Sequence, residues 1–99
     1  MTDRSSREPD QVRMTAFVRG RVQGVGFRWW TRSRALELGL VGSATNRSDG
    51  RVEVVAEGRR ADCDQLLVLL RGADTPGVVE SVVEQFGAPR GVGPGFVER

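Results

Sequence analysis

Residues 12–39 read VRMTAFVRGRVQGVGFRWWTRSRALELG, and three patterns follow one another along this segment. Residues 20–26 are rich in glycine, which adopts backbone angles that other residues avoid. Apolar or small side chains recur at helical spacing over residues 27–38. Before the glycines, residues 12–19 alternate as in a β-strand whose buried face carries Met14, Ala16 and Val18. The segment therefore predicts a strand, a tight loop and a helix that Gly39 ends.

The rest of the chain predicts a β-hairpin, a second helix and a further strand. The turn of the hairpin is Ser48-Asp49-Gly50, and the apolar stripe of the second helix is formed by leucines. The expected elements are strands over 40–46, 51–58 and 78–86, a helix that Asp62 caps and that ends at Gly72, and a terminal segment over 96–98 that is short enough to be either a loop or a fifth strand.

This order of elements, β-α-β-β-α-β, is the ferredoxin-like arrangement of the α+β class. It predicts a four-stranded antiparallel sheet with both helices on one face. Residues 12–99 are expected to form this single domain, and the polar residues 1–11 are expected to be a disordered tail.

The composition is that of a soluble globular protein, with 38% hydrophobic and 28% charged residues. No apolar run approaches the ~18 residues that a membrane-spanning helix needs, and residues 1–11 contain no apolar stretch of the kind that a secretory signal requires. The one cysteine, Cys63, lies among leucines and is expected to be a buried hydrophobic residue. We therefore expect a cytoplasmic monomer without a membrane partner.

The absence of several residue types excludes many catalytic mechanisms. The chain has no His, no Lys and no Tyr, so all 15 basic residues are arginines. Without His there is no Ser-His or Cys-His pair, and without Lys there is no Schiff base. Catalysis would have to use arginine, backbone N–H groups, amides, hydroxyls or carboxylates, and we expect neither a metal nor another cofactor.

The glycine-rich turn predicts a site for an anion, which we call the phosphate-binding loop (residues 23–28). A loop that leads straight into a helix points free N–H groups in one direction, at the positive end of the helix dipole. Arg28 falls in the first helical turn, where a cation is unfavourable by ~0.3–1 kcal/mol, so another interaction should hold it there. A bound phosphate would do so, although such a turn can also be a tight connection and no more.

Two blocks of the sequence closely resemble the signature of the acylphosphatases. They are GRVQGVGFR, residues 20–28, and GLVGSATNRSDGRVEV, residues 39–54, and the similarity extends over residues 12–99. The resemblance implies hydrolysis of a small-molecule acyl phosphate to a carboxylate and inorganic phosphate. It also implies that Arg28 binds the phosphate and that Asn46 positions the attacking water. The implied phosphate-binding residues are Gln23, Gly24, Val25, Gly26, Phe27 and Arg28.

Some residues admit a second interpretation. Asn46 precedes a turn, and asparagine is also a common turn residue. Many acylphosphatases carry an aromatic and a larger residue where this chain has Ser43-Ala44, so substrate affinity could differ. Trp30 is expected to pack in the core, whereas Trp29 is either a surface residue or a contact for an acyl group.

Two rival functions remain open at this stage. One is a noncatalytic ferredoxin-like module that binds a small anion or nucleic acid, although the strands lack the aromatic set with which such sheets stack RNA bases. The other is a detached relative of the acylphosphatase-like domain of hydrogenase-maturation carbamoyltransferases. Acetyl phosphate, carbamoyl phosphate and 1,3-bisphosphoglycerate all remain candidate substrates, and nucleic acid is not an expected partner.

Overall fold

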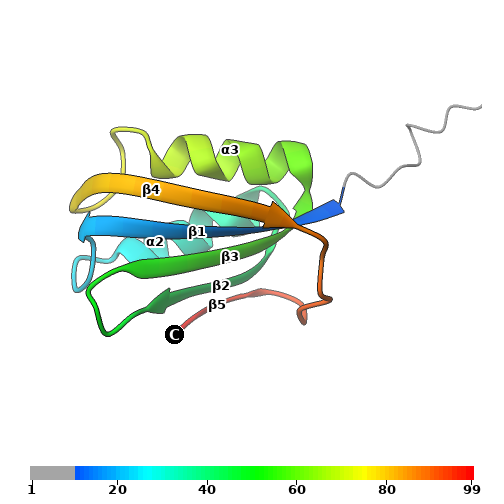
Figure 1. The fold of residues 1–99 in the computed structure, drawn as a ribbon, viewed down its shortest axis with the longest axis horizontal. Coiled ribbons are helices and arrows are strands. Elements are labelled where there is room, and N and C mark those ends of the chain that lie inside the picture. The colour runs from blue at the N-terminus through cyan, green and yellow to red at the C-terminus, as the bar shows by residue number, and fades with distance from the viewer. Residues whose placement is uncertain (1–10) are drawn as a thin grey trace, which may run out of the picture.

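The computed structural model describes residues 11–99, which form one sheet and two helices (Figure 1). The predicted tail, residues 1–11, lies outside the described residues except for Gln11, which begins the first strand. The elements are β1 (Gln11–Arg21), α2 (Phe27–Glu37), β2 (Val41–Asn46), β3 (Val52–Arg59), α3 (Arg60–Leu70), β4 (Val78–Gly87) and β5 (Phe96–Glu98).

The five strands form a single mixed sheet in the order β4-β1-β3-β2-β5. The first four pair in antiparallel fashion, as the ferredoxin-like arrangement requires. The terminal segment forms a fifth strand, and β5 pairs in parallel with β2 at the edge of the sheet. Both helices cover the same face of the sheet, while the opposite face is open (Figure 1). The predicted fold is therefore confirmed, with the short fifth strand included.

The core lies between the helices and the covered face of the sheet. It contains the predicted face of β1, formed by Met14, Ala16 and Val18, all fully buried. Trp30 is 9% exposed and belongs to this core, as expected. Cys63 is also buried, and burial raises the pKa of its thiol to about 11. The thiol is therefore protonated and unreactive at neutral pH.

One helix begins elsewhere than predicted. Asp62 was expected to cap the second helix, but α3 begins at Arg60 and has Arg59 as its N-terminal flanking residue. Asp62 lies instead in the first helical turn, where its negative charge still favours the helix dipole. The start moves because β3 runs directly into α3 without an intervening loop. No helix within residues 11–99 is long and apolar enough to cross a membrane.

A buried carboxylate fixes the segment that leads to β5. Glu57 is 6% exposed and accepts a hydrogen bond from the Arg13 guanidinium, at 2.8 Å. It also accepts from three successive backbone N–H groups, those of Arg90, Gly91 and Val92, at 2.7, 3.1 and 3.4 Å. Burial by itself would raise the pKa of Glu57, but these donors together lower it to about 2.

This arrangement predicts a loss of stability in acid. Because the folded state lowers the pKa of Glu57 from 4.5 to about 2, its contribution to stability is present above pH 4.5 and is lost as the pH falls towards 2. Denaturant unfolding at several pH values should show the free energy of unfolding falling across this window. Glu57→Gln should remove most of that pH dependence, whereas Glu37→Gln, in an exposed ion pair, should not. If the free energy of unfolding depended on pH equally in both variants, this role of Glu57 would be contradicted.

Candidate active site

The phosphate-binding loop joins β1 to α2 through two glycines in the left-handed region. Gly24 has a φ of 76° and Gly26, the residue that flanks the helix, has a φ of 84°. Phe27 begins α2 and is buried, so the start of the helix is anchored in the core. No side chain caps this helix. Its first N–H groups, which have no partner within the helix, are therefore available to an anion.

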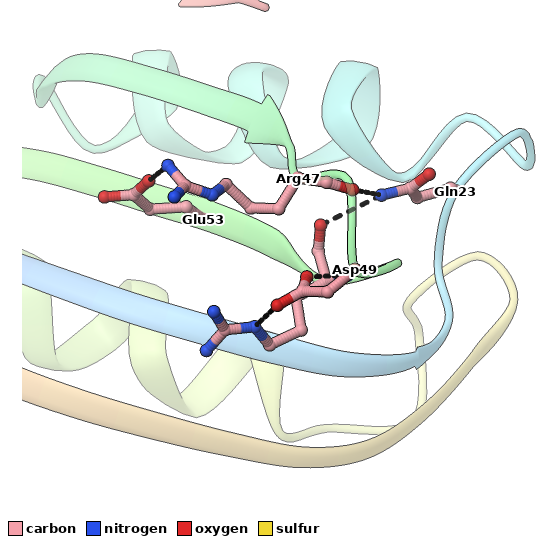
Figure 2. Close-up of polar contacts among 5 residues, drawn as sticks. Gln23, Arg47, Asp49 and Glu53 are labelled. Atoms are coloured by element: carbon pink, nitrogen blue, oxygen red, sulfur yellow. Dashed lines mark hydrogen bonds and ion pairs between the residues drawn. The ribbon is translucent and has the colours of Figure 1, made fainter.

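Gln23 ties the loop to the turn that follows Asn46. Its side-chain Nε2 donates to the backbone oxygens of Arg47 and Arg51, at 2.8 and 3.0 Å (Figure 2). This turn is closed by its own hydrogen bond from the Gly50 N–H to the Arg47 oxygen. The side chain of Gln23 thus fixes the phosphate-binding loop against the turn between β2 and β3. Binding of phosphate by its backbone N–H, which the resemblance implied, stays a prediction.

A single backbone oxygen connects Arg28 with Asn46. Nη1 of Arg28 donates to the backbone oxygen of Arg99 at 2.8 Å, and the N–H of Asn46 donates to the same oxygen at 3.4 Å. The N–H of Arg99 in turn donates to the oxygen of Ala44. Two predicted site residues from different elements therefore meet beside the end of β5. Arg99 was not identified from the sequence, because no local pattern indicates a contact between two residues that are 71 positions apart.

The hydrogen bond from Arg28 to Arg99 also explains why a cation can lie in the first turn of α2. The Arg99 oxygen provides the compensating partner that we had assigned to a phosphate. It engages one nitrogen of Arg28, and a guanidinium has five N–H donors in a planar fork. Donors therefore remain that can bind two oxygens of a phosphate while the side chain is held in place.

Asn46 presents an unsatisfied oxygen on the helix side of the sheet. It is the last residue of β2 and pairs with Val52, which is fully buried in the core, so both side chains lie on the covered face. Oδ1 of Asn46 is buried without a hydrogen-bond partner, as is Oγ1 of Thr31 in the facing helix. Among residues 11–99 these are the buried side-chain polar atoms left without a partner. Such an atom is free to accept a hydrogen bond from a water molecule.

The arginines of the neighbouring turn are already paired. Arg47 forms an ion pair with Glu53 at 2.8 Å, and Arg51 forms one with Asp49 at 2.8 Å, both in Figure 2. Arg51 also lies over the ring of Phe17, 4.5 Å from its centre. Their charges are thus compensated by neighbouring carboxylates, whereas Arg28 donates to the oxygen of Arg99, the last residue of the sequence, beside the loop.

The dipeptide Ser43-Ala44 lies within β2. Ala44 is fully buried and pairs with Val54 in β3 and with Glu98 in β5. Ser43 borders a shallow depression formed with the segment before β5. An effect of these small residues on substrate affinity stays a prediction.

The conformation of the loop can be tested with a pair of glycine variants. Gly24 and Gly39 have nearly the same φ, 76° and 74°, and no atom lies within 4 Å of a Cβ added to either. Substitution of either glycine by alanine should therefore lower the free energy of unfolding by about 1–2 kcal/mol, measured by denaturant unfolding. Only Gly24→Ala should also weaken binding of inorganic phosphate, by about tenfold, because it moves N–H donors. A similar loss of phosphate affinity in Gly39→Ala would show that the effect is not local.

Comparison with families of known proteins gives one consistent match. The family model described as Acylphosphatase matches residues 14–97, which is most of the chain. The chain is 67% identical over 90 residues to the acylphosphatase of Thermobifida fusca, an alignment that covers 91% of this chain and 99% of that protein.

Solved structures agree with this match. The structure of an acylphosphatase from Coxiella burnetii superposes with a TM-score of 0.81 at 32% identity and covers all of both chains. The acylphosphatase from Bacillus subtilis superposes with a TM-score of 0.75 at 30% identity, covering 89% of this chain and 98% of that one. The chain is thus similar to these proteins in sequence and in fold.

Proposed function

Because the chain belongs to the acylphosphatase family and so hydrolyses acyl phosphates, we propose that Arg28, Asn46 and the phosphate-binding loop carry out this reaction. One observation above all supports this assignment. Arg28 and Asn46 hydrogen-bond to the same backbone oxygen, next to a helix N-terminus that no side chain caps. A phosphate bound there would meet a guanidinium, several N–H groups and a side-chain amide together.

Arg28 and the loop would bind the phosphoryl group. The guanidinium fork engages two phosphoryl oxygens, and the N–H groups of residues 23–28 engage the remaining negative charge. In a largely dissociative transition state this charge lies on the three equatorial oxygens of the phosphoryl group. Donors that are held in place before the reaction stabilise that charge without a cost in reorganisation.

Asn46 would orient the water. Its unpartnered Oδ1 accepts a hydrogen bond from the water, while its Nδ2 can donate to a phosphoryl oxygen. The water oxygen forms a bond to phosphorus as the bond from phosphorus to the acyl oxygen breaks. The carboxylate leaves with the electron pair of that bond, and needs little help from an acid because it is a stable anion. The products are a carboxylate and inorganic phosphate.

The proton of the water would pass to the substrate's own phosphate. The chain has no His, and the carboxylates with identified partners near the loop, Asp49 and Glu53, are paired with arginines. We therefore expect kcat to change little between about pH 5 and pH 8. A sharp bell-shaped profile in steady-state measurements would instead indicate a protein group acting as general base.

The activity itself can be measured with benzoyl phosphate, whose loss is followed by ultraviolet absorbance in metal-free buffer. A phosphate monoester is the matched control, because its leaving alkoxide needs an acid that this site does not offer. Turnover of benzoyl phosphate alone is the expected result. If the chain hydrolyses neither compound but binds inorganic phosphate or RNA, the noncatalytic binding module is the better account.

We also propose that the protein acts as a monomer in the cytoplasm and binds no nucleic acid. The fully buried Cys63, protonated at neutral pH, fits a reducing compartment. Light scattering after size-exclusion chromatography should give a mass near 10.8 kDa. A stable dimer in that measurement would contradict the proposed state.

A further inference from the structure

The side chain of Gln23 binds both ends of the turn between β2 and β3, which we call the hairpin turn (residues 47–51). Its Nε2 donates to the backbone oxygens of Arg47 and Arg51 at 2.8 and 3.0 Å (Figure 2). The N–H of Arg47 also donates to the Arg51 oxygen, at 2.8 Å, so the two residues meet at the base of the turn. Both N–H donors of one side-chain amide are therefore used on the hairpin turn.

The hairpin turn continues directly from the residue proposed to orient the water. Asn46 is the last residue of β2 and pairs with Val52, the first residue of β3. The carbonyl of Arg47, which Gln23 holds, therefore lies one residue beyond Asn46. Because peptide units are planar and rigid, a shift of this carbonyl also moves the backbone of Asn46.

The phosphate-binding loop is anchored in the core, whereas the hairpin turn is not. Val22 and Phe27 lie on either side of residues 23–26, and each is only 1% exposed. Residues 47–50, by contrast, are all exposed. A segment with few buried contacts is the one that shifts when a hydrogen bond is lost. Gln23 therefore fixes a mobile turn against a rigid loop.

We propose that Gln23 is a positioning residue, whose side chain sets where Asn46 holds the water relative to the phosphate bound in the loop. This inference rests on the proposed function and adds one residue to it. In-line attack requires the water about 3–3.5 Å from phosphorus and opposite the leaving carboxylate. The side chain of Gln23 touches neither the water nor the substrate in this role, and acts through the hairpin turn and Asn46.

The role of Gln23 should appear in turnover more than in folding stability. Gln23 is exposed, so water can replace its two hydrogen bonds to the carbonyls when the side chain is removed. Water molecules satisfy the carbonyls, but they do not hold the turn at one distance from the loop. A small displacement of a reacting group can nevertheless lower the rate strongly.

The first test is Gln23→Met, which keeps the length of the side chain and removes both donors. Its kcat for benzoyl phosphate should fall about tenfold. Inhibition by inorganic phosphate should change by less than about twofold, because Arg28 and the backbone N–H groups remain. Gln65→Met is the matched control, since Gln65 is an exposed residue of α3, and it should leave both quantities unchanged. A kcat of Gln23→Met equal to that of the natural chain would overturn the positioning role and leave the proposed function standing.

A double-mutant cycle tests whether Gln23 acts through Asn46. In an Asn46→Ala background there is no amide left to position, so adding Gln23→Met should change kcat by less than about twofold. A merely structural role would instead lower kcat by the same factor in both backgrounds. That additive result would overturn the proposal.

Amide hydrogen exchange, followed by NMR, examines the hairpin turn without relying on activity. The N–H groups of Arg47 and Gly50 close this turn, by donating to the oxygens of Arg51 and Arg47. They should exchange about tenfold faster in Gln23→Met than in the natural chain. Unchanged exchange would overturn the proposal even if kcat falls. If the natural chain hydrolyses no acyl phosphate, the proposed function fails, and the positioning role fails with it whatever the exchange rates show.

Discussion

Arg28→Ala should lower kcat/KM for benzoyl phosphate by about 10³-fold or more, since an arginine on a transferring phosphoryl group is typically worth that much. The reason is that Arg28 is the arginine that β5 positions at the phosphate-binding loop through the Arg99 oxygen. Its removal takes away both the bidentate grip on the phosphate and the charge that stabilises the transition state. Steady-state kinetics, together with inhibition by inorganic phosphate, should show losses in both turnover and phosphate affinity.

Arg32→Ala is the matched control for this change. Arg32 lies one turn further along α2, and its Nε donates to the backbone oxygen of Phe96 in β5 at 3.0 Å. Both arginines therefore tie α2 to the C-terminal segment, Arg32 to β5 and Arg28 to the residue that follows it, but only Arg28 lies in the phosphate-binding loop. A loss of activity in Arg32→Ala as large as in Arg28→Ala would mean that the packing of β5, rather than the phosphate contact, matters. Retention of most activity in Arg28→Ala would refute the proposed site.

Asn46→Ala should reduce kcat by about 10²–10³, as is typical when one oriented polar group of an active site is lost. Affinity for inorganic phosphate should change far less, because Arg28 and the backbone N–H groups provide most of the binding. This separation between kcat and phosphate inhibition distinguishes an orienting role from a binding role.

Thr45→Ala provides the control for Asn46→Ala within the same strand. Successive strand residues point to opposite faces, so Thr45 lies on the open face of the sheet while Asn46 faces the helices. Its removal should leave kcat near that of the natural chain. If Asn46→Ala weakens phosphate binding as much as it lowers kcat, Asn46 is a phosphate ligand and another group must orient the water.

Local patterns were sufficient to predict most of the fold. The alternation of Met14, Ala16 and Val18 predicted the buried face of β1, and helical spacing predicted α2 from Phe27. These patterns succeed because each depends on neighbours within a few residues. The start of α3 was misplaced because Asp62 is a good capping residue, yet the chain continues straight from β3 and turns into the helix at Arg60.

The residues of the proposed site were identified from two short blocks of sequence, one with the glycines and Arg28 and one with Asn46. The glycines and Arg28 fall within nine residues and could be recognised together. The contacts that arrange them are long-range: Gln23 reaches Arg47 and Arg51, and Arg28 reaches Arg99. A single sequence carries no signal for such pairs, because they depend on how the sheet order brings distant strand ends together.

The central claim is that a water molecule attacks phosphorus in the site formed by Arg28 and Asn46. Hydrolysis of benzoyl phosphate in water enriched in oxygen-18, followed by mass spectrometry of both products, tests it most directly. The account predicts that the label enters inorganic phosphate and that benzoate remains unlabelled. Label in benzoate would mean that water attacks the carbonyl carbon, and it would contradict the roles given to Arg28 and Asn46.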